Sequence, residues 1–326
     1  MTSSRLAPLS LLAVSALALA GCASGPDADD GAVRVVASTD VYGQIAEAIG
    51  GDAVEVTSIV TSGAQDPHSF EPSAQDQLAV SRADLILENG GGYDGFIDAL
   101  IESSGVDAPV LTAAEFSHDW PENAGHEAEA AHTDDAEDEH TEHDHGDHAH
   151  VEGFNEHVWY DPHAMAHFAE AIADELTALD PDGADDFAAN LEEFEAGIAE
   201  VEDALAAVAT SDAGAHVFVT EPVALYLVTA ADLHNVTPPA FTEAVEEGQD
   251  VPPSTLLEAL RLLGNGDVRV VIANAQTGGP ETEEAIRAAE TAGIPVVEFA
   301  ETLPEGQTYL SWMDENVAAL ADALSR

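Results

Sequence analysis

Residues 33–51 read V-R-V-V-A-S-T-D-V-Y-G-Q-I-A-E-A-I-G-G, and this stretch decides the fold. The apolar, β-branched run over residues 33–37 predicts a buried strand. Residues 38–40 can cap a helix, and Gly50-Gly51 can end it. The apolar side chains between them fall on one helical face: Val41, Ile45 and Ile49. A strand that leads directly into a helix begins the alternation typical of a parallel sheet.

The alternation continues along the first third of the chain. Further strands are predicted over residues 54–60, 84–87 and 109–111, and helices over 73–83 and 93–103. Strands that alternate with helices predict a parallel sheet covered on both faces.

The same pattern returns near the C-terminus. Strands are predicted over residues 216–220, 268–273 and 295–299. Helices are predicted over 222–231, 254–263, 280–292 and 307–326. The two halves therefore resemble each other in type, although no sequence repeat relates them.

Helices dominate the middle of the chain. One is predicted over residues 162–179, and a turn (D-P-D-G) separates it from a long amphipathic helix over 184–210. A helix of that length spans roughly 39 Å, which suits a strut. The apolar stripe of this helix is formed by Phe187, Leu191, Phe194, Ile198, Val201 and Leu205. We therefore predict an α/β fold of two lobes, each a mostly parallel sheet flanked by helices, joined by a long rigid helix.

The domain boundaries follow from these elements. The N-terminal lobe is expected over residues 33–162, including an irregular loop over 118–153. Helices occupy residues 163–210, with the linking helix over 184–210. The C-terminal lobe covers 211–326.

The first residues have the features of a bacterial lipoprotein signal. Arg5 precedes an apolar run over residues 6–20 that is too short to span a bilayer comfortably. The run ends in L-A-G-C, which resembles the lipoprotein processing box, so we expect a signal peptide over 1–21 and a lipid on Cys22. An ordinary signal peptide followed by a chance cysteine is the alternative. Residues 22–32 are small and acidic, as expected of a flexible tether. The mature protein is then extracytoplasmic and attached to the membrane only through its lipid anchor.

The charge balance limits the partners. The chain has 64 acidic residues against seven arginines and no lysine. Nucleic acid and anionic lipid surfaces are therefore excluded as partners. The acidity itself is typical of a solubility or salt adaptation. Because Cys22 is the one cysteine, stability must come from packing rather than from disulfides.

A histidine-rich segment interrupts the first lobe. Residues 126–150 hold seven histidines and ten acidic residues, and no large apolar residue, so we expect disorder. The segment is either a solvated spacer or a weak, multivalent collector of metal ions. The second interpretation assigns auxiliary metal binding to His140, His143, His145, His148 and His150.

Four polar side chains lie in loops at predicted strand ends or just before helices: His68, His157, Glu221 and Glu301. Taken alone, His68, Glu221 and Glu301 are ordinarily solvated side chains, whereas His157 fits a ligand and a non-ligand role equally well. Ligand sites in open parallel sheets lie outside the carboxyl ends of the strands, so the four can converge in a cleft between the lobes. Two imidazoles and two carboxylates form a mixed shell suited to zinc, manganese or ferrous iron.

The motifs around these residues resemble those of the cluster A-I (cluster 9) substrate-binding proteins of ABC transporters for zinc and manganese. The resemblance covers about residues 33–326. D-P-H-S-F-E-P resembles the element of the first metal ligand, His68, and H-V-W-Y-D-P that of the second, His157. T-E-P-V-A-L-Y-L resembles the third element, with Glu221 as ligand. The family commonly has Asp at the fourth position, where Glu301 in E-T-L-P-E-G-Q-T-Y is the nearest match.

Other polar residues near these motifs receive supporting or alternative roles. Asp66, Asn274 and Gln276 are expected beside the ligands, and Gln276 or water is an alternative fourth ligand. His163 and His167 are spaced to chelate a metal on one helical face, but the family pattern places the ligand at His157. His216 and His234 are expected to be ordinary packed or surface residues.

The resemblance implies a binding protein that captures Zn²⁺ between its lobes, acts as a monomer and delivers the ion to an ABC permease and its ATPase subunit. Zn²⁺ is preferred because of the histidine-rich segment, whereas two carboxylate ligands favour Mn²⁺, and Fe²⁺ is a further alternative. An enzyme is not expected, because H-E-x-x-H, nucleophile-elbow and phosphate-loop motifs are absent. A metal-dependent hydrolase and a metal-buffering adhesin are the alternatives from other classes.

Overall fold

The computed structural model describes residues 31–121, 123, 151 and 153–326. The chain divides into two units, Met1–Gly31 and Ala32–Arg326, and the architecture below is that of the second. The predicted signal peptide, the lipid site Cys22 and the histidine-rich segment over 126–150 lie outside the described residues.

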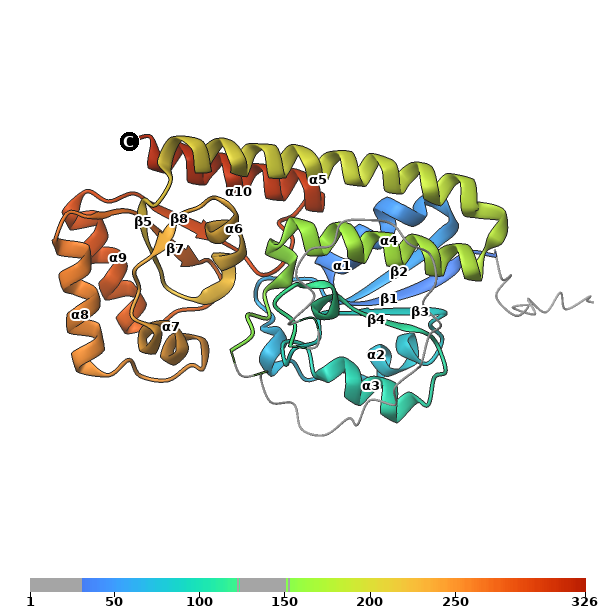
Figure 1. Ribbon diagram of the computed structural model, residues 1–326. Coiled ribbons are helices and arrows are strands. Elements are labelled where there is room, and N and C mark those ends of the chain that lie inside the picture. The colour runs from blue at the N-terminus through green and yellow to red at the C-terminus, as the bar shows by residue number, and fades with distance from the viewer. Residues whose placement is uncertain (1–30, 122, 124–150, 152) are drawn as a thin grey trace, which may run out of the picture. The chain divides into compact units, whose positions relative to one another are not determined.

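The first sheet consists of four parallel strands in the order β2-β1-β3-β4 (Figure 1). Their bounds are β1 (Val33–Thr39), β2 (Val54–Val60), β3 (Leu85–Glu88) and β4 (Val110–Thr112). The chain crosses from β1 to one side and then returns to the other side with β3. The prediction of a parallel sheet is confirmed, because every pairing is parallel.

Strand β1 is buried on both faces. Val35 and Ala37 belong to a core shared with α1 (Asp40–Gly50) and α4 (Pro162–Leu179). Val36 points to the opposite core, which contains residues of α2 (Ala74–Val80) and α3 (Phe96–Ser104). Because side chains alternate along a strand, one apolar run supplies both cores.

The second sheet has the same topology, with parallel strands in the order β6-β5-β7-β8. Its strands are β5 (His216–Val219), β6 (His234–Asn235), β7 (Val268–Asn274) and β8 (Val296–Phe299). Strand β6 is absent from the prediction because two residues are too short to show a period. It pairs His234 with His216, and the two rings lie 5.4 Å apart.

We call the part with the first sheet the first half and the part with the second sheet the second half. The helices of the second half are α6 (Leu225–Ala230), α7 (Pro239–Glu246), α8 (Pro253–Gly264) and α9 (Pro280–Ala292). Helices α7, α8 and α9 share a core with Phe218 of β5 and Val271 of β7. Helix α7 is absent from the prediction. Two prolines at its start and the four-residue spacing of Phe241 and Val245 are the signals that could have revealed it.

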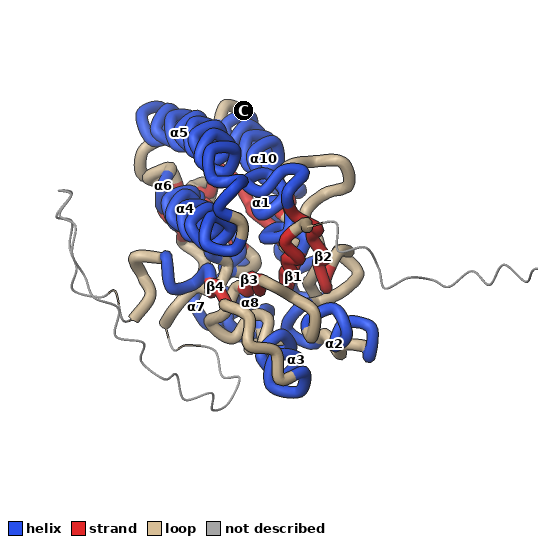
Figure 2. Tube along the Cα trace, turned by 90° about the vertical axis from the view of Figure 1, so that its right-hand side faces the viewer, coloured by secondary structure: helices blue, strands red, loops and turns tan. Residues whose placement is uncertain are grey.

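The long helix is α5 (Ala184–Asp212), and the C-terminal helix α10 (Tyr309–Leu324) lies along it (Figures 1 and 2). Helix α5 also contacts α1 and α4 of the first half and α6 of the second. The long linking helix is therefore confirmed, and it packs against both halves rather than standing free between them.

One hydrophobic core runs through both halves. It contains Val35 of β1 and Ile272 of β7, together with Phe194 of α5 and Tyr309 of α10. The rings of Phe194 and Tyr309 are stacked with centroids 5.8 Å apart. A shared, close-packed core resists large relative movement of the halves because separation would expose apolar surface.

Among the described residues, we find no helix whose length and apolar character would allow it to cross a membrane.

The predicted cap of α1 does not form. Thr39 is the N-cap residue, and its side chain makes no capping hydrogen bond. Instead, the Oδ1 atom of Asp40 accepts a hydrogen bond from the backbone N–H of Leu303, at 3.0 Å. A residue read as a helix cap thus connects the first half to a loop of the second.

Phe194→Ala should lower the free energy of unfolding by about 3–5 kcal/mol, because it removes a large side chain from the core shared by both halves. Urea unfolding followed by circular dichroism measures this loss. Leu257→Ala is the control, since Leu257 is 49% exposed and its truncation should change stability by only about 0.5 kcal/mol. Equal losses for the two variants would contradict the shared core.

Candidate metal centre

The site is built from loops that follow strands of both sheets. His68 lies in the 3₁₀ turn Pro67–Ser69 after β2, and His157 precedes the 3₁₀ turn Val158–Tyr160. Glu221 follows β5, and Glu301 follows β8. Carboxyl ends of parallel strands are where backbone groups and loops are free to bind ligands.

The position of His68 is determined by Asp66. The Asp66 Oδ1 atom accepts a hydrogen bond from the His68 backbone N–H at 3.0 Å, and Oδ2 accepts one from the Ser69 hydroxyl at 2.8 Å. Asp66, predicted beside the ligands, therefore stiffens the turn. The Nε2 atom of His68 lies 3.3 Å from Oε1 of Glu156, and the His68 side chain is 22% exposed.

His157 is almost completely buried, with 2% of its surface exposed. Its Nδ1 atom lies 2.8 Å from the Oδ1 atom of Asn155, which also accepts the His157 backbone N–H. Tyr93 and Trp159 pack around the ring, with centroids 5.9 Å and 5.2 Å away. These contacts fix the ring orientation and leave the pair of electrons on Nε2 for coordination.

Glu301 is 3% exposed and is bound through both carboxylate oxygens. Oε1 accepts a hydrogen bond from the Asn274 amide at 2.6 Å, and Oε2 accepts one from the Tyr93 hydroxyl at 3.2 Å. Tyr93 belongs to the first half and Asn274 to the second. The Glu301 carboxylate is thus oriented from both sides of the site.

Glu221 is 6% exposed and shares the same amide. The Nδ2 atom of Asn274 donates to Oε2 of Glu221 at 2.9 Å, and the Thr277 hydroxyl donates to the same oxygen. The other oxygen, Oε1, is buried and has no hydrogen-bond partner among the described residues. A buried carboxylate oxygen without a partner carries a desolvation cost, which a bound cation would offset.

The environment disfavours charged carboxylates when no cation is present. The pKa of Glu301 is raised to about 7, chiefly by burial and also by the nearby Glu221 carboxylate, although the hydrogen bond from the Asn274 amide lowers it. Burial also raises the pKa of Glu221, against the hydrogen bonds from Thr277 and Asn274. A divalent cation between these groups would stabilise their ionised forms.

Three of the four predicted ligands converge. One ligand atom each from His68, His157 and Glu301 lies within 4.8 Å of the others. Two atoms bound to one tetrahedral zinc ion are about 3.4 Å apart, so metal binding would draw the three together slightly. Glu221 is outside this group but is joined to Glu301 through the Asn274 amide. The two nitrogens and the carboxylates fit a transition metal.

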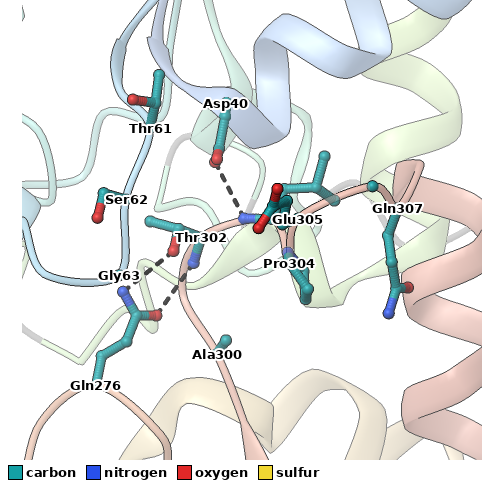
Figure 3. Close-up of a pocket in the computed structure, with 12 residues that line it drawn as sticks. Asp40, Thr61, Ser62, Gly63, Gln276, Ala300, Thr302, Pro304, Glu305 and Gln307 are labelled. Carbon is teal, nitrogen blue, oxygen red and sulfur yellow. Dashed lines mark hydrogen bonds between the residues drawn. The ribbon is translucent and has the colours of Figure 1, made fainter.

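The Gln276 side chain positions the backbone of the loop that follows β8. Its Oε1 atom accepts hydrogen bonds from the backbone N–H groups of Glu301 and Thr302. Its Nε2 atom donates to the Thr302 hydroxyl at 3.2 Å, and Figure 3 shows both bonds to Thr302. The side-chain oxygen that would serve as an alternative fourth ligand is therefore already occupied by backbone donors. Asp40 holds the same loop at Leu303.

Solvent reaches the site from the side of these loops. A cavity of about 130 Å³ is bounded by Glu301 and by Gly63, Ala64, Gln65, Asp66, Pro67, Gln276 and Thr277. Its lining joins the His68 loop of the first half to the strand ends of the second, so it offers a small ion a polar approach to Glu301.

Two acidic residues near the site are absent from the prediction. Glu156 and Glu246 each place a carboxylate oxygen close to His157, and the three ligand atoms lie within 4.8 Å of one another. Glu156 directly precedes His157 in the sequence, so its position in the motif was a usable signal. Glu246 lies on α7 and could be placed only by the tertiary structure. Tyr93 was also missed.

The other histidine pairs lie elsewhere. His163 and His167 are neighbours on α4, with ring centroids 4.6 Å apart, and His167 bonds to Glu170 at 3.0 Å. His216 and His234 are neighbours across β5 and β6. None of the four belongs to the metal-type groups found among the described residues.

Comparison with known proteins gives relatives that handle manganese or zinc. The manganese-binding lipoprotein MntA of Halalkalibacterium halodurans is 30% identical over 196 residues, which are 59% of this chain and 56% of that protein. A manganese ABC transporter substrate-binding lipoprotein, PsaA of Streptococcus mitis, is 31% identical over 202 residues, covering 58% of this chain and 56% of that protein. The zinc-binding protein AdcA of Streptococcus pyogenes is 25% identical over 195 residues, covering 60% of this chain and 37% of that protein.

The chain thus matches little more than half the length of the manganese relatives and less of the zinc relative. Solved structures resemble it over nearly its whole described length. The periplasmic zinc-binding protein TroA from Treponema pallidum has a TM-score of 0.68 at 17% identity and covers 91% of this chain and 100% of that chain. A crystal structure of ZnuA has a TM-score of 0.66 at 19% identity, covering 90% and 99%. At these identities the likeness establishes the two-lobed fold alone.

A family model described as zinc-uptake complex component A, periplasmic (ZnuA), matches residues 35–323. This match includes both sheets, the long helix and all four candidate ligands. The chain therefore belongs to the ZnuA family of zinc-uptake complex components.

Proposed function

We propose that this protein captures a divalent transition metal, Zn²⁺ by preference, outside the cytoplasm and delivers it to an ABC permease and its ATPase subunit. His68, His157, Glu221 and Glu301 bind the ion between the two halves. The observation that carries this proposal is the convergence of two imidazoles and the buried Glu301 carboxylate at the strand ends. The buried Glu221 carboxylate is joined to Glu301 through the Asn274 amide, and its Oε1 atom has no hydrogen-bond partner among the described residues.

The electrostatics support cation capture. Glu221 and Glu301 are both buried, and they share a single side-chain amide. Two neighbouring buried carboxylates repel each other when ionised, and a dication removes that repulsion. Four protein ligands satisfy a tetrahedral zinc ion, so this arrangement fits binding and transfer better than hydrolysis, which needs an open coordination position.

The location of the protein follows from its N-terminus and its relatives. MntA and PsaA are lipoproteins by name, and the L-A-G-C sequence that ends at Cys22 of this chain resembles a lipoprotein processing box. A lipid on Cys22 would keep the monomeric binding protein beside its permease. The core shared by the halves favours small movements on loading, so release would depend on the permease disturbing the ligands.

Zinc and manganese are distinguished by ligand chemistry. Sites made of nitrogen and oxygen ligands generally bind zinc more tightly than manganese, and the histidine-rich segment also favours zinc. Two carboxylates and the manganese-binding relatives favour manganese as the second candidate.

His68→Ala and His157→Ala should each lower the affinity for zinc by more than about 100-fold, because each removes a direct ligand. Loss of a residue that only hydrogen-bonds to a ligand already costs about 10- to 100-fold. Isothermal titration calorimetry of the metal-free full chain measures the affinity. The double variant His163→Ala/His167→Ala is the matched control and should bind zinc as the unaltered protein does. Intact high-affinity binding in His157→Ala would refute the proposed site.

Zinc should bind more tightly than manganese by at least about tenfold, in keeping with the general affinity order for mixed nitrogen and oxygen sites. Metal analysis of the purified protein, followed by titration of the manganese-loaded protein with zinc, measures the preference. Equal affinity, or failure of zinc to displace manganese, would assign the site to manganese.

Asn274→Ala should weaken zinc binding by about 10- to 100-fold, because Glu221 and Glu301 would lose the donor that orients both carboxylates. The same calorimetric titration measures this effect. Asn265→Ala, an exposed position at the end of α8, provides the control and should leave the affinity unchanged. Unaltered binding in Asn274→Ala would show that the shared amide has no part in holding the ligands.

A further inference from the structure

Helix α7 brings a third acidic side chain to His157. One ligand atom each from Glu156, His157 and Glu246 lies within 4.8 Å of the others. This distance is the same limit that applies to His68, His157 and Glu301. His157 is the member common to the two groups, and Glu246 belongs to the second alone.

The hydrogen bonds of His157 determine which nitrogen serves the two groups. The Oδ1 atom of Asn155 accepts the His157 backbone N–H, so this oxygen acts as an acceptor there. It lies 2.8 Å from Nδ1, which therefore carries the ring proton. The pair of electrons is then on Nε2. One pair of electrons binds one metal ion, so the two groups cannot both hold an ion through His157 at the same time.

Glu156 belongs to the second group and also contacts His68 of the first group. Its Oε1 atom is 3.3 Å from Nε2 of His68, and the residue is 3% exposed. Movement of this carboxylate away from His68 and towards an ion near His157 would release the His68 imidazole for coordination. Glu156 thus borders the proposed site and belongs to the second group.

The carboxyl group of Glu246 interacts electrostatically with the acidic residues of the proposed site. Burial and, to a smaller extent, the carboxylates of Glu156, Glu221 and Glu301 together raise the pKa of Glu246 to about 8. A divalent cation bound beside these carboxylates would stabilise the ionised form of Glu246.

We propose that Glu156, His157 and Glu246 form a second position for the divalent cation, which the ion occupies as an alternative to the proposed site and never together with it. This inference rests on the proposed function. Its members supply one imidazole and two carboxylates, a harder and more oxygen-rich set than the proposed site. The second position therefore binds zinc more weakly.

The shared histidine would allow the ion to pass between the second position and the proposed site without leaving the protein. Because His157 is common to both positions, the ion can remain bound to it while Glu246 is exchanged for His68 and Glu301. Exchange of ligands one at a time avoids the loss of all coordination in a single step. Glu246 would thereby act on the rate of metal entry and release.

The test isolates the second position by disabling the first. Calorimetric titration of the full chain with zinc chloride is carried out on His68→Ala, which keeps all three members of the second group. His68→Ala/His157→Ala removes both positions and gives the background from zinc bound elsewhere on the chain. Glu246→Gln is then added to His68→Ala. Glu247→Gln, the same change at the exposed neighbouring residue, is the matched control.

We expect His68→Ala to retain one weak, His157-dependent zinc ion. Glu246→Gln should weaken that ion by at least about tenfold, whereas Glu247→Gln should change its affinity by less than about threefold, as expected for loss of a ligand against loss of a distant charge. Glu301→Gln serves as a second way to disable the first position, in case His68→Ala disturbs the fold. Circular dichroism melting checks the fold of every variant.

Equal affinities with Glu246→Gln and Glu247→Gln, in both backgrounds, would overturn the second position. Two zinc ions bound at once, and both lost with His157→Ala, would overturn the mutual exclusion. Either result leaves the proposed function standing if the unaltered chain binds zinc through His68 and His157. Failure of the unaltered chain to bind zinc or manganese through His157 would instead overturn the proposed function and this inference with it.

Discussion

Two buried carboxylates in this protein depend on one amide. Asn274 donates hydrogen bonds to both Glu221 and Glu301, and the three side chains come from the ends of three strands of one sheet, β5, β7 and β8. Buried acids that are close together are costly when ionised. The amide lowers that cost, but one oxygen of Glu221 has no hydrogen-bond partner in the part of the chain that the structure describes. The local structure therefore favours a cation between the halves, and the parallel topology explains why the acids meet there.

The imidazoles complete the site from the opposite half. Four hydrogen bonds between the halves hold the two sides of the site in position relative to each other. They join Asp40 to Leu303, Tyr93 to Glu301, Tyr160 to Ala300, and Tyr309 to Trp159. The continuous core beneath them includes residues of α5 and α10. These contacts therefore hold the proposed ligands in place before any ion binds. Preorganised ligands lose little entropy on binding, which favours high affinity.

The acidic residues around His157 form a second group of candidate ligands beside the proposed site. Glu156 and Glu246 place two more carboxyl groups close to His157, and this buried imidazole is common to both groups of candidate ligands. The function that we propose requires the protein to release its ion as well as hold it. The two overlapping positions that we propose would reconcile these needs, because an ion in the weaker position would be closer to release yet still bound.

The amino-acid sequence by itself determined the alternation of strands and helices, the long helix, and the loops that carry His68, His157, Glu221 and Glu301. These follow from local periodicity, turn residues and motifs, which act over a few residues. It did not reveal β6 and α7, or the use of Asp40 as a tie to Leu303. The tertiary structure alone decided that Glu246 lies beside His157, 89 positions away in the sequence, and that Asn274 joins two carboxylates. Such contacts depend on how the sheets and helices pack, and local patterns carry no record of that packing.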